Sequence, residues 1–276
     1  MNAEKSELDA EAVLFDRRSL LFLPASNPRA IAKARDSAAD MVILDLEDAV
    51  KAEDKKSARD AAIDAVASAW PMPVAIRVNG VGSEWHSLDL DAVARSNADY
   101  VVVPRAISAH LVKGVADAVG KPVLAMIETA AGVLAAAKIA PATAGLIAGT
   151  NDLAADLRLP PDAGRASLQT ALQLILLAAR AAGVAAFDGV FNKLDDEAGF
   201  VAQAEEGRRL GFDGKSLIHP NQIAPCHRAF APSEAELDRA RRLIAAFDGG
   251  AERFEDAMVE RMHVEAAKHL LSRGQT

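Results

Sequence analysis

The stretch MVILDLED (residues 41–48) decides the fold class of this 276-residue chain. Its first residues are apolar without interruption, as expected of a strand that is buried on both faces of a parallel sheet. Acidic residues then close the run. The same rhythm, a short apolar run that ends in polar residues, recurs along the sequence. We therefore expect eight strands, over residues 19–24, 41–48, 74–80, 100–106, 123–129, 145–153, 184–190 and 215–220.

Alanine-rich amphipathic segments separate these runs. The clearest is SAHLVKGVADAVG (residues 108–120), where Ser108 suits a helix N-cap and Gly120 a helix end. Eight strands alternating with helices predict an α/β fold, a (β/α)₈ TIM barrel over residues 17–231. A doubly wound open sheet is the alternative. It usually carries a glycine-rich turn after its first strand, but LPASNPR (residues 23–29) contains no glycine.

Segments on either side of the predicted barrel look like extensions. Residues 1–16 form a predicted N-terminal extension, and residues 232–276 a C-terminal helical extension of the kind that forms lids or subunit contacts. The sequence SEAE (residues 233–236) predicts a capping box at the start of a helix. A Gly-Gly break at residues 249–250 precedes a second predicted helix, ERFEDAMVERMHVEAAKHLL (residues 252–271).

Composition restricts the partners and the compartment. A net charge of −8 argues against a nucleic-acid-binding surface. No apolar run reaches the roughly 18 residues of a membrane span, and the acidic N-terminus lacks the features of a signal peptide. Cys226 is the single cysteine, so no internal disulfide forms and a cytoplasmic location is expected. An inert thiol is favoured over a nucleophile at this position.

Polar side chains stand where nearly every predicted strand ends, which is where barrel enzymes carry their catalytic groups. Any one of them could instead have a purely structural role, since Asp48 and Asp152 could each cap the helix that follows. The functional reading is that residues from different strands converge on one mouth. The residues concerned are Asp45, Glu47, Asp48, Arg77, Asn79, Arg105, Glu128, Asn151, Asp152, Asp188 and His219.

A cation is the natural companion of such a cluster. Neighbouring carboxylates raise one another's pKa unless a positive charge intervenes. Two or more carboxylates that leave room for water suit Mg²⁺. The six histidines show no spacing typical of zinc, so a zinc site is discounted.

Three basic residues have both a structural and a functional interpretation. Arg77, within AIRVNG, is either a structural partner of buried carboxylates or a bidentate receptor for a substrate carboxylate. Arg29 and Lys33 are spaced i,i+4 after the first strand. They either form a solvated face or bind the phosphates of a large cofactor-like substrate beside a helix N-terminus.

These motifs together resemble a known family, the citrate lyase β-subunit-like CoA-ester lyases of the HpcH/HpaI aldolase superfamily, relatives of malyl-CoA and citramalyl-CoA lyases. The resemblance covers about residues 17–271. It is carried by RRSLLFLPASNPR, ADMVILDLEDAV followed by KKSAR, IRVNG, MIETAAGV, GTNDLAADL, LGFDGKSLIHPNQI and FAPSEAELDRAR, in this order.

The resemblance implies roles for individual residues. Glu128 and Asp152 match the family's Mg²⁺ ligands, and Arg77 matches the arginine that holds substrate carboxylate or carbonyl oxygens. Asp45 and Glu47 would order the metal's waters or its surroundings, and Glu47 or a metal-ordered water would be the general base. The positions that match the family's CoA-contacting regions are Phe22, Arg29, Lys33, Ile218 and His219.

The implied reaction is a retro-aldol cleavage of a malyl-CoA-like or citramalyl-CoA-like ester to acetyl-CoA and a 2-oxo acid, by a homo-oligomer (trimer or hexamer). Two departures stand out: Arg105 replaces a lysine, and Glu260 in AMVE replaces the aspartate of relatives that hydrolyse the thioester. We therefore expect lyase activity without efficient hydrolysis. The alternatives are a citrate lyase β subunit that acts on an acyl-ACP thioester with partner subunits, and a non-catalytic barrel used as a binding module.

Overall fold

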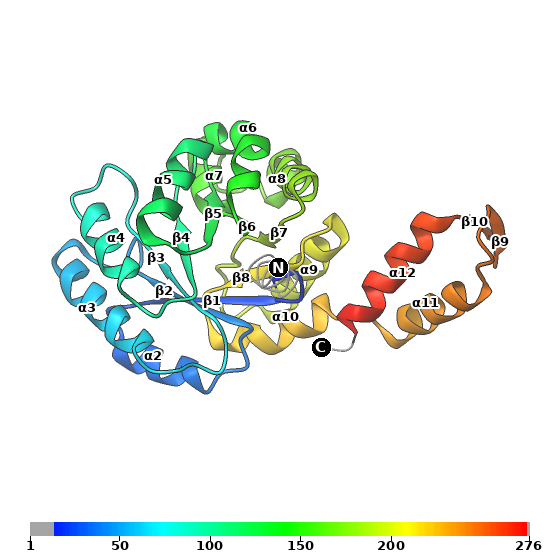
Figure 1. Ribbon diagram of the computed structural model, residues 1–276, viewed down its shortest axis with the longest axis horizontal. Coiled ribbons are helices and arrows are strands. Elements are labelled where there is room, and N and C mark those ends of the chain that lie inside the picture. Colours follow the sequence, from blue (N-terminus) through cyan, green and yellow to red (C-terminus); the bar gives the residue numbers. More distant parts are fainter. Residues whose placement is uncertain (1–13, 275–276) are drawn as a thin grey trace, which may run out of the picture. The chain divides into compact units, whose positions relative to one another are not determined.

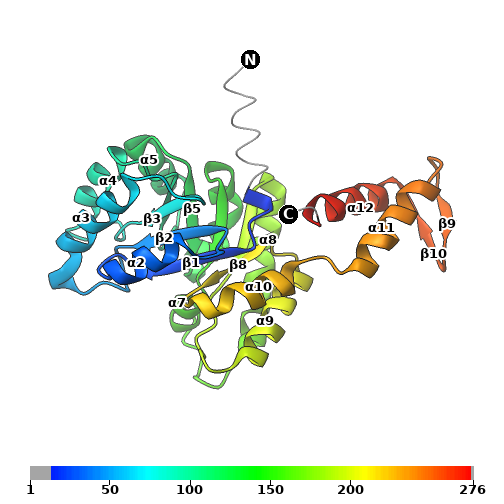
Figure 2. The same ribbon diagram turned by 90° about the horizontal axis from the view of Figure 1, so that it is seen from below.

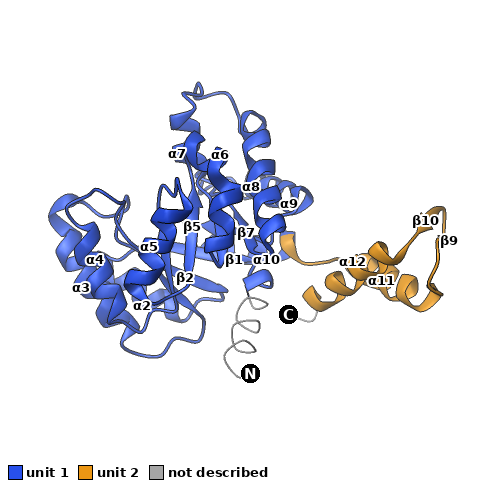
Figure 3. Ribbon diagram, turned by 45° about the horizontal axis from the view of Figure 1, so that its top comes forward, with its two compact units in different colours: residues 1–229 blue, residues 230–276 orange. Residues whose placement is uncertain are grey.

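The computed structural model describes residues 14–274, so the predicted N-terminal extension lies almost wholly outside the described residues. The chain divides into two compact units, residues 1–229 and 230–276 (Figure 3). The first unit is a closed barrel of eight parallel strands, which confirms the predicted TIM barrel and excludes the doubly wound sheet. Within the described residues, no helix combines the length and hydropathy needed to cross a membrane.

The strands follow one another around the barrel in sequence order, and β8 closes it by pairing with β1. Their neighbours in the sheet are all parallel, as a β/α repeat requires. The strands are β1 (Ser19–Pro24), β2 (Met41–Asp45), β3 (Val74–Arg77), β4 (Tyr100–Val103), β5 (Val123–Ile127), β6 (Gly145–Ala148), β7 (Ala185–Asp188) and β8 (Gly214–Leu217).

Helices surround this barrel on the outside (Figures 1 and 2). The predicted caps of the helix after β4 are confirmed, since Ser108 accepts a hydrogen bond from Leu111 N and Gly120 ends the helix in the left-handed region. The helices are α2 (Pro28–Arg35), α3 (Lys55–Val66), α4 (His86–Ala94), α5 (Ala109–Val119), α6 (Ala130–Ile139), α7 (Thr150–Asp156), α8 (Gln169–Ala182), α9 (Glu197–Leu210) and α10 (Ile223–Phe230). Short 3₁₀ turns are η1 (Ala52–Asp54), η2 (Ala140–Ala142), η3 (Arg165–Leu168) and η4 (Pro220–Gln222).

Seven of the eight predicted strands end earlier than the sequence pattern suggested, and β1 alone keeps its predicted bounds. Their polar ends therefore lie at the last strand residue or in the loops beyond it. Asp45 and Arg77 are the final residues of β2 and β3, whereas Glu128 and Asp152 follow the ends of β5 and β6. The mouth of the barrel is thus formed by the groups that closed the apolar runs.

The inside of the barrel is an apolar core up to the level of this mouth. Because successive side chains of a strand point to opposite sides, residues two apart share the interior. On β2, Met41 and Ile43 are followed inward by Asp45, and on β5, Met126 is followed by Glu128. Charged groups thus take over the positions of core residues in the uppermost layer. Other members of the core are Leu20, Ala75, Val102, Leu124, Ile147, Ala185 and Phe187.

The second unit consists of α11 (Glu234–Ala246), β9 (Glu252–Phe254), β10 (Ala257–Val259) and α12 (Arg261–Arg273). The capping box predicted at Ser233 is confirmed, with Glu236 as its partner. The helix predicted over residues 252–271 is wrong in its first part, which is an antiparallel hairpin. Glu255 adopts a positive φ of 55° in the two-residue turn. Phe254 and Val259, one from each strand of the hairpin, belong to an apolar cluster with residues of α11 and α12.

A buried ion network joins β7, β8 and α9 in the barrel. The Nζ of Lys215, which is fully buried, donates to Asp188 Oδ2 at 2.8 Å, to Gln203 Oε1 at 2.7 Å and to the Gly189 carbonyl. Arg165 Nη2 contacts the other Asp188 oxygen at 2.8 Å. Removing one member of such a network leaves charged and polar groups buried without partners.

We expect the change Lys215→Met to lower the free energy of unfolding by about 3–5 kcal/mol, because the Asp188 and Gln203 oxygens lose their donor inside the protein. Urea denaturation measures this loss. Lys56→Met is the matched control, since Lys56 forms an exposed ion pair with Asp60 and its loss should change stability by less than about 1 kcal/mol. Equal effects of the two changes would contradict a structural role of the network.

Candidate active site

A cavity of about 430 Å³ opens at the carboxyl ends of the strands. It is lined by five of the nine predicted site residues: Phe22, Arg77, Glu128, Asp152 and Ile218. These residues come from the ends of β1, β3 and β5 and from the segments after β6 and β8. The structure thus brings together side chains that lie almost 200 positions apart in the sequence.

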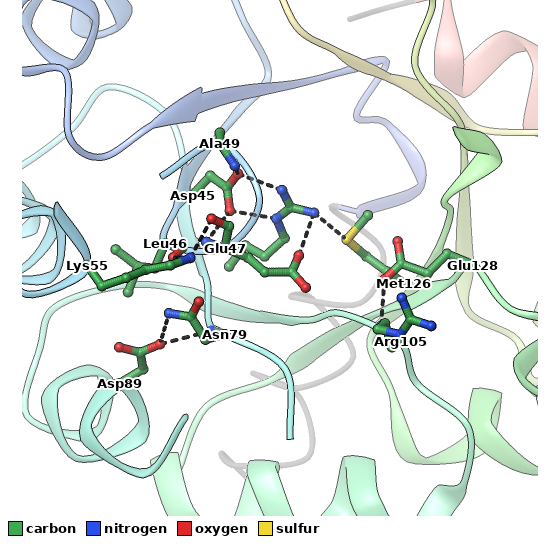
Figure 4. Close-up of polar contacts among 11 residues, drawn as sticks. Asp45, Leu46, Glu47, Ala49, Lys55, Asn79, Asp89, Arg105, Met126 and Glu128 are labelled. Carbon is green, nitrogen blue, oxygen red and sulfur yellow. Dashed lines mark hydrogen bonds and ion pairs between the residues drawn. The ribbon is translucent and has the colours of Figure 1, made fainter. Parts of the chain in front are cut away.

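The guanidinium of Arg77 is the centre of this site, and its contacts are drawn in Figure 4. Its Nε and Nη2 donate to the two oxygens of Asp45 at 2.6 and 2.5 Å, and Nη1 lies 2.9 Å from Glu47 Oε2. The ring of Phe22 lies 5.4 Å from its carbon atom. Burial opposes the charge, but the hydrogen bond and charge of Asp45 raise the pKa of Arg77 further, so the guanidinium stays positive.

The structural interpretation of Arg77 agrees with these contacts, whereas a role in binding a substrate carboxylate stays a prediction. The bidentate edge of the guanidinium is occupied by Asp45, as the structural reading expected. The Nη1 edge contacts Glu47 and the sulfur of Met126, at 3.7 Å, and Arg77 remains part of the cavity wall. A ligand in the cavity would reach this arginine through its Nη groups and not through the two-pronged edge.

Glu128 has one satisfied and one unsatisfied carboxylate oxygen. Oε1 accepts a hydrogen bond from the backbone N–H of Arg105 at 2.6 Å, whereas Oε2 is buried without a hydrogen-bond partner. Burial raises the pKa of Glu128 to about 7; the Arg105 N–H and Arg77 oppose the rise, and the negative charges of Asp152 and Asp48 add to it. Among the described residues, Oε2 of Glu128 therefore has no hydrogen-bond donor to balance its negative charge.

Glu47 is in a similar position beside Arg77. Burial raises the pKa of Glu47 to about 8; Arg77 opposes this rise, and the carboxylates of Asp48, Glu128 and Asp45 add to it. Glu47 is not part of the cavity wall, although its carboxylate contacts a residue that is. Glu47 could therefore influence a ligand in the cavity through the charge of Arg77, or exchange a proton with it through water.

The backbone of Arg105 is turned into the left-handed region, with φ of 47°. This conformation costs a non-glycine residue roughly 1–2 kcal/mol. It accompanies the hydrogen bond from the Arg105 N–H to Glu128, while the Arg105 side chain is exposed to solvent. The position thus orients Glu128 through its backbone, which bears on the departure from lysine noted in the sequence.

Two glycines lie close to residues of the cavity wall, Gly149 against Glu128 and Gly189 against Thr150. A Cβ atom on Gly149, just after β6, would lie 2.3 Å from Glu128 Cβ and 2.5 Å from Glu128 Oε2. A Cβ atom on Gly189, just after β7, would lie 2.4 Å from the hydroxyl oxygen of Thr150. Neither position accepts a side chain without displacing its neighbours, so the absence of side chains there shapes the site.

The arrangement fits a divalent cation. Asp45, Glu47, Asp48, Glu128 and Asp152 gather around one arginine, and the buried Oε2 of Glu128 lacks any hydrogen-bond donor. Over residues 14–274 no group of three or more acidic, histidine or cysteine side chains forms a complete cation cage. Two carboxylates with water in the remaining positions is the coordination that Mg²⁺ accepts, and Glu128 and Asp152 are the residues that would hold it.

Lys55 holds the backbone of the acidic loop after β2. Its Nζ donates to the carbonyl oxygens of Leu46 and Glu47 at 2.7 and 2.6 Å (Figure 4). Asp48 lines the cavity and does not cap the following helix, because η1 (Ala52–Asp54) intervenes with Lys51 as its N-cap. The capping reading of Asp48 is thus wrong.

Asp152 and His219 differ from one another in their local roles. Asp152 lies in the first turn of α7, whose N-cap is Gly149, so it is free of the capping role considered for it and lines the cavity. His219 is outside the cavity wall, and its Nδ1 accepts a hydrogen bond from Asn221 N at 3.2 Å. Arg29 and Lys33 are exposed on α2 and are also outside the wall.

Several features of the site were missed in the sequence. Gly149, Met126 and Ser216 line the cavity, and the only available signal was their position in or just after the apolar runs. Cys226 is buried, and burial raises its pKa to about 12. Its thiol therefore stays protonated, as expected of an inert cysteine.

The closed barrel and the carboxylate-rich cavity at the carboxyl ends of its strands define a (β/α)₈-barrel protein whose candidate active site lies where barrel enzymes carry theirs. The chain belongs to the HpcH/HpaI aldolase/citrate lyase family, whose model matches residues 18–220. The resemblance seen in the motifs is therefore confirmed.

Named relatives and solved structures agree with this assignment. A (3S)-malyl-CoA thioesterase from Cereibacter sphaeroides is 44% identical over 271 residues, which cover 94% of each chain. The citrate lyase subunit beta of Escherichia coli is 35% identical and covers 94% of this chain and 93% of its own. The structure of CitE from Mycobacterium tuberculosis with magnesium, acetoacetate and coenzyme A matches with a TM-score of 0.85 at 36% identity, covering 94% of this chain and 98% of its own.

We expect Gly149→Ala to reduce activity on CoA esters at least about 100-fold, because the new Cβ atom displaces the Glu128 carboxylate by a distance that matters for catalysis. Steady-state kinetics measures the loss, and circular dichroism should show a retained fold. Gly114→Ala in α5 is the matched control, since nothing lies within 4 Å of the added atom and activity should stay unchanged. Wild-type activity in Gly149→Ala would contradict the steric role of this glycine.

Proposed function

We propose that this protein is a Mg²⁺-dependent carbon–carbon lyase that cleaves a malyl-CoA-like or citramalyl-CoA-like ester to acetyl-CoA and a 2-oxo acid. The observation that carries the proposal is the buried, unpartnered Oε2 of Glu128 beside Asp152 at the wall of the cavity. Such an oxygen is costly unless a cation or donor reaches it. Support comes from CitE, whose structure contains magnesium and coenzyme A.

Each residue of the site has a part in this proposal. Glu128 and Asp152 would hold Mg²⁺, which when bound supplies a Lewis acid that polarises the carbonyl or hydroxyl oxygen of the acid fragment. Arg77 contributes a fixed positive charge beside the developing oxygen charge, and its geometry is preorganised by Asp45. Glu47, in contact with Arg77, is the side-chain candidate for the base that removes the hydroxyl proton, directly or through water.

The large end of the substrate would lie outside the cavity. Phe22 and Ile218 line the wall, while Arg29 and Lys33 present exposed positive charge on α2. This arrangement supports an acyl group inside the cavity, with the phosphates of CoA near the outer surface. His219 is engaged in its local hydrogen bond and contributes to this region mainly by shaping η4.

Thioester hydrolysis is the second candidate, because the relative from Cereibacter sphaeroides is named a malyl-CoA thioesterase. Against it stands the replacement of the aspartate of relatives that hydrolyse the thioester by Glu260, the N-cap residue of α12, whose N–H donates to His263 Nδ1 at 3.0 Å. The extra methylene of glutamate moves the carboxylate by more than about 1 Å, which costs about 100-fold where the geometry is critical. Action as a citrate lyase β subunit with partner proteins remains a further alternative, favoured by the relative from Escherichia coli.

Product analysis separates these functions. With malyl-CoA or citramalyl-CoA and Mg²⁺, we expect acetyl-CoA and glyoxylate or pyruvate to appear at equal rates, and free CoA to appear more slowly. Mass spectrometry and a thiol reagent measure the products. Free CoA without 2-oxo acid would instead establish hydrolysis. Cleavage of citryl thioester only after addition of partner subunits would establish the citrate lyase role, and binding without turnover of any ester a non-catalytic barrel.

We expect Glu128→Gln to weaken Mg²⁺ binding at least about tenfold and to lower kcat/KM at least about 100-fold, because one carboxylate ligand is lost while the acceptor for the Arg105 N–H is kept. Calorimetry with Mg²⁺ and steady-state kinetics measure the two effects. Glu53→Gln, an exposed carboxylate in η1, is the control that removes the same charge outside the site. Unchanged Mg²⁺ affinity in Glu128→Gln would refute the ligand assignment.

A further inference from the structure

Ser216 lies at the floor of the cavity, where the apolar interior of the barrel ends. It is a residue of β8, is 2% exposed and lines the cavity. In the sheet it stands opposite Leu20 of β1, a member of the barrel core. On its other side, Asp188 pairs with Lys215, so the position next to Ser216 on β7 belongs to Gly189, which has no side chain.

The hydroxyl of Ser216 is buried and forms no hydrogen bond. Its neighbours explain this, because Leu20 has no polar atoms and Gly189 offers no side chain. A buried hydroxyl without a partner is destabilising relative to an apolar group of the same size. Alanine would fill this position at no such cost. The serine therefore has no packing role that accounts for its hydroxyl.

Two buried, unpartnered side-chain atoms line the cavity within the described residues, and they differ in character. Glu128 Oε2 is an acceptor, whereas Ser216 Oγ is a donor as well as an acceptor. The first fits a cation. The second fits an anionic oxygen of the ligand, since Arg77, the charged donor in the wall, has its bidentate edge occupied by Asp45.

The part of the substrate that reaches the floor is its acid end. The nucleotide portion of a CoA ester is too large to enter a cavity of about 430 Å³ along with the acyl group, so it must remain towards the mouth. A carboxylate has two oxygens and accepts several hydrogen bonds. Because the two-pronged edge of Arg77 is taken, that arginine cannot bind both carboxylate oxygens through this edge, and a donor from another strand would complete their hydrogen bonds.

We propose that Ser216 is a substrate-binding residue, whose hydroxyl donates a hydrogen bond to a carboxylate oxygen of the 2-oxo acid fragment at the cavity floor. The inference rests on the proposed lyase function and adds to it a specific contact for the acid product. Because the contact is the same before and after cleavage, it strengthens binding of ester and product alike.

The experiment compares wild type with Ser216→Ala. Calorimetry with glyoxylate and with pyruvate, each in the presence of Mg²⁺, should show binding about 10-fold to 100-fold weaker in the variant, since hydrogen bonds to charged groups contribute about 1.5–3 kcal/mol. In kinetics with malyl-CoA, KM should rise by a similar factor while kcat changes less than about threefold. The melting temperature should stay equal or rise, because an unsatisfied hydroxyl is removed.

Ser83→Ala is the matched control, because the Ser83 hydroxyl is also buried without a partner but does not line the cavity. It should leave acid binding unchanged. If wild type binds and cleaves but Ser216→Ala binds both acids as tightly as wild type, the inference is overturned and the proposed function stands. If wild type neither binds a 2-oxo acid nor cleaves a CoA ester, the proposed function fails and the inference fails with it.

Discussion

The ion pair between Arg77 and Asp45 is the interaction on which the mouth of this barrel depends. Five carboxylates gather where the interior of the barrel would otherwise be apolar, and one guanidinium offsets part of their repulsion. The bidentate geometry fixes that guanidinium and, through it, Glu47. Burial and neighbouring carboxylates still raise the pKa values of Glu47 and Glu128 despite this guanidinium, an excess of acidic groups that a divalent cation would offset.

Steric constraints complete what the charges begin. An added Cβ atom on Gly149 would meet Glu128 and one on Gly189 would meet Thr150, and the strained backbone of Arg105 directs an N–H at Glu128. The cavity therefore depends both on glycines that leave room for its wall residues and on the charged groups that line it. Ser216 stands on its floor as a polar group with no partner in the protein.

The sequence predicted the architecture well because a fold of eight buried strands leaves a strong imprint. Uninterrupted apolar runs located β1 to β8, and the polar residues that ended them marked the mouth, including Arg77 and Glu128. Strand ends, the hairpin at residues 252–259 and the contribution of Ser216 were not foreseen. These depend on which side of the sheet a residue faces and on what lies across from it, which one-dimensional patterns do not carry.

The contact of Lys55 with the Leu46 and Glu47 carbonyls has a consequence for redesign. The acidic loop is thus held by a side chain of α3 that is not part of the cavity wall. A change in the length of the Lys55 side chain would thus alter the geometry of the acidic loop without replacing any residue of the cavity wall. Position 55 is therefore a site outside the cavity from which the geometry of the cavity can be engineered.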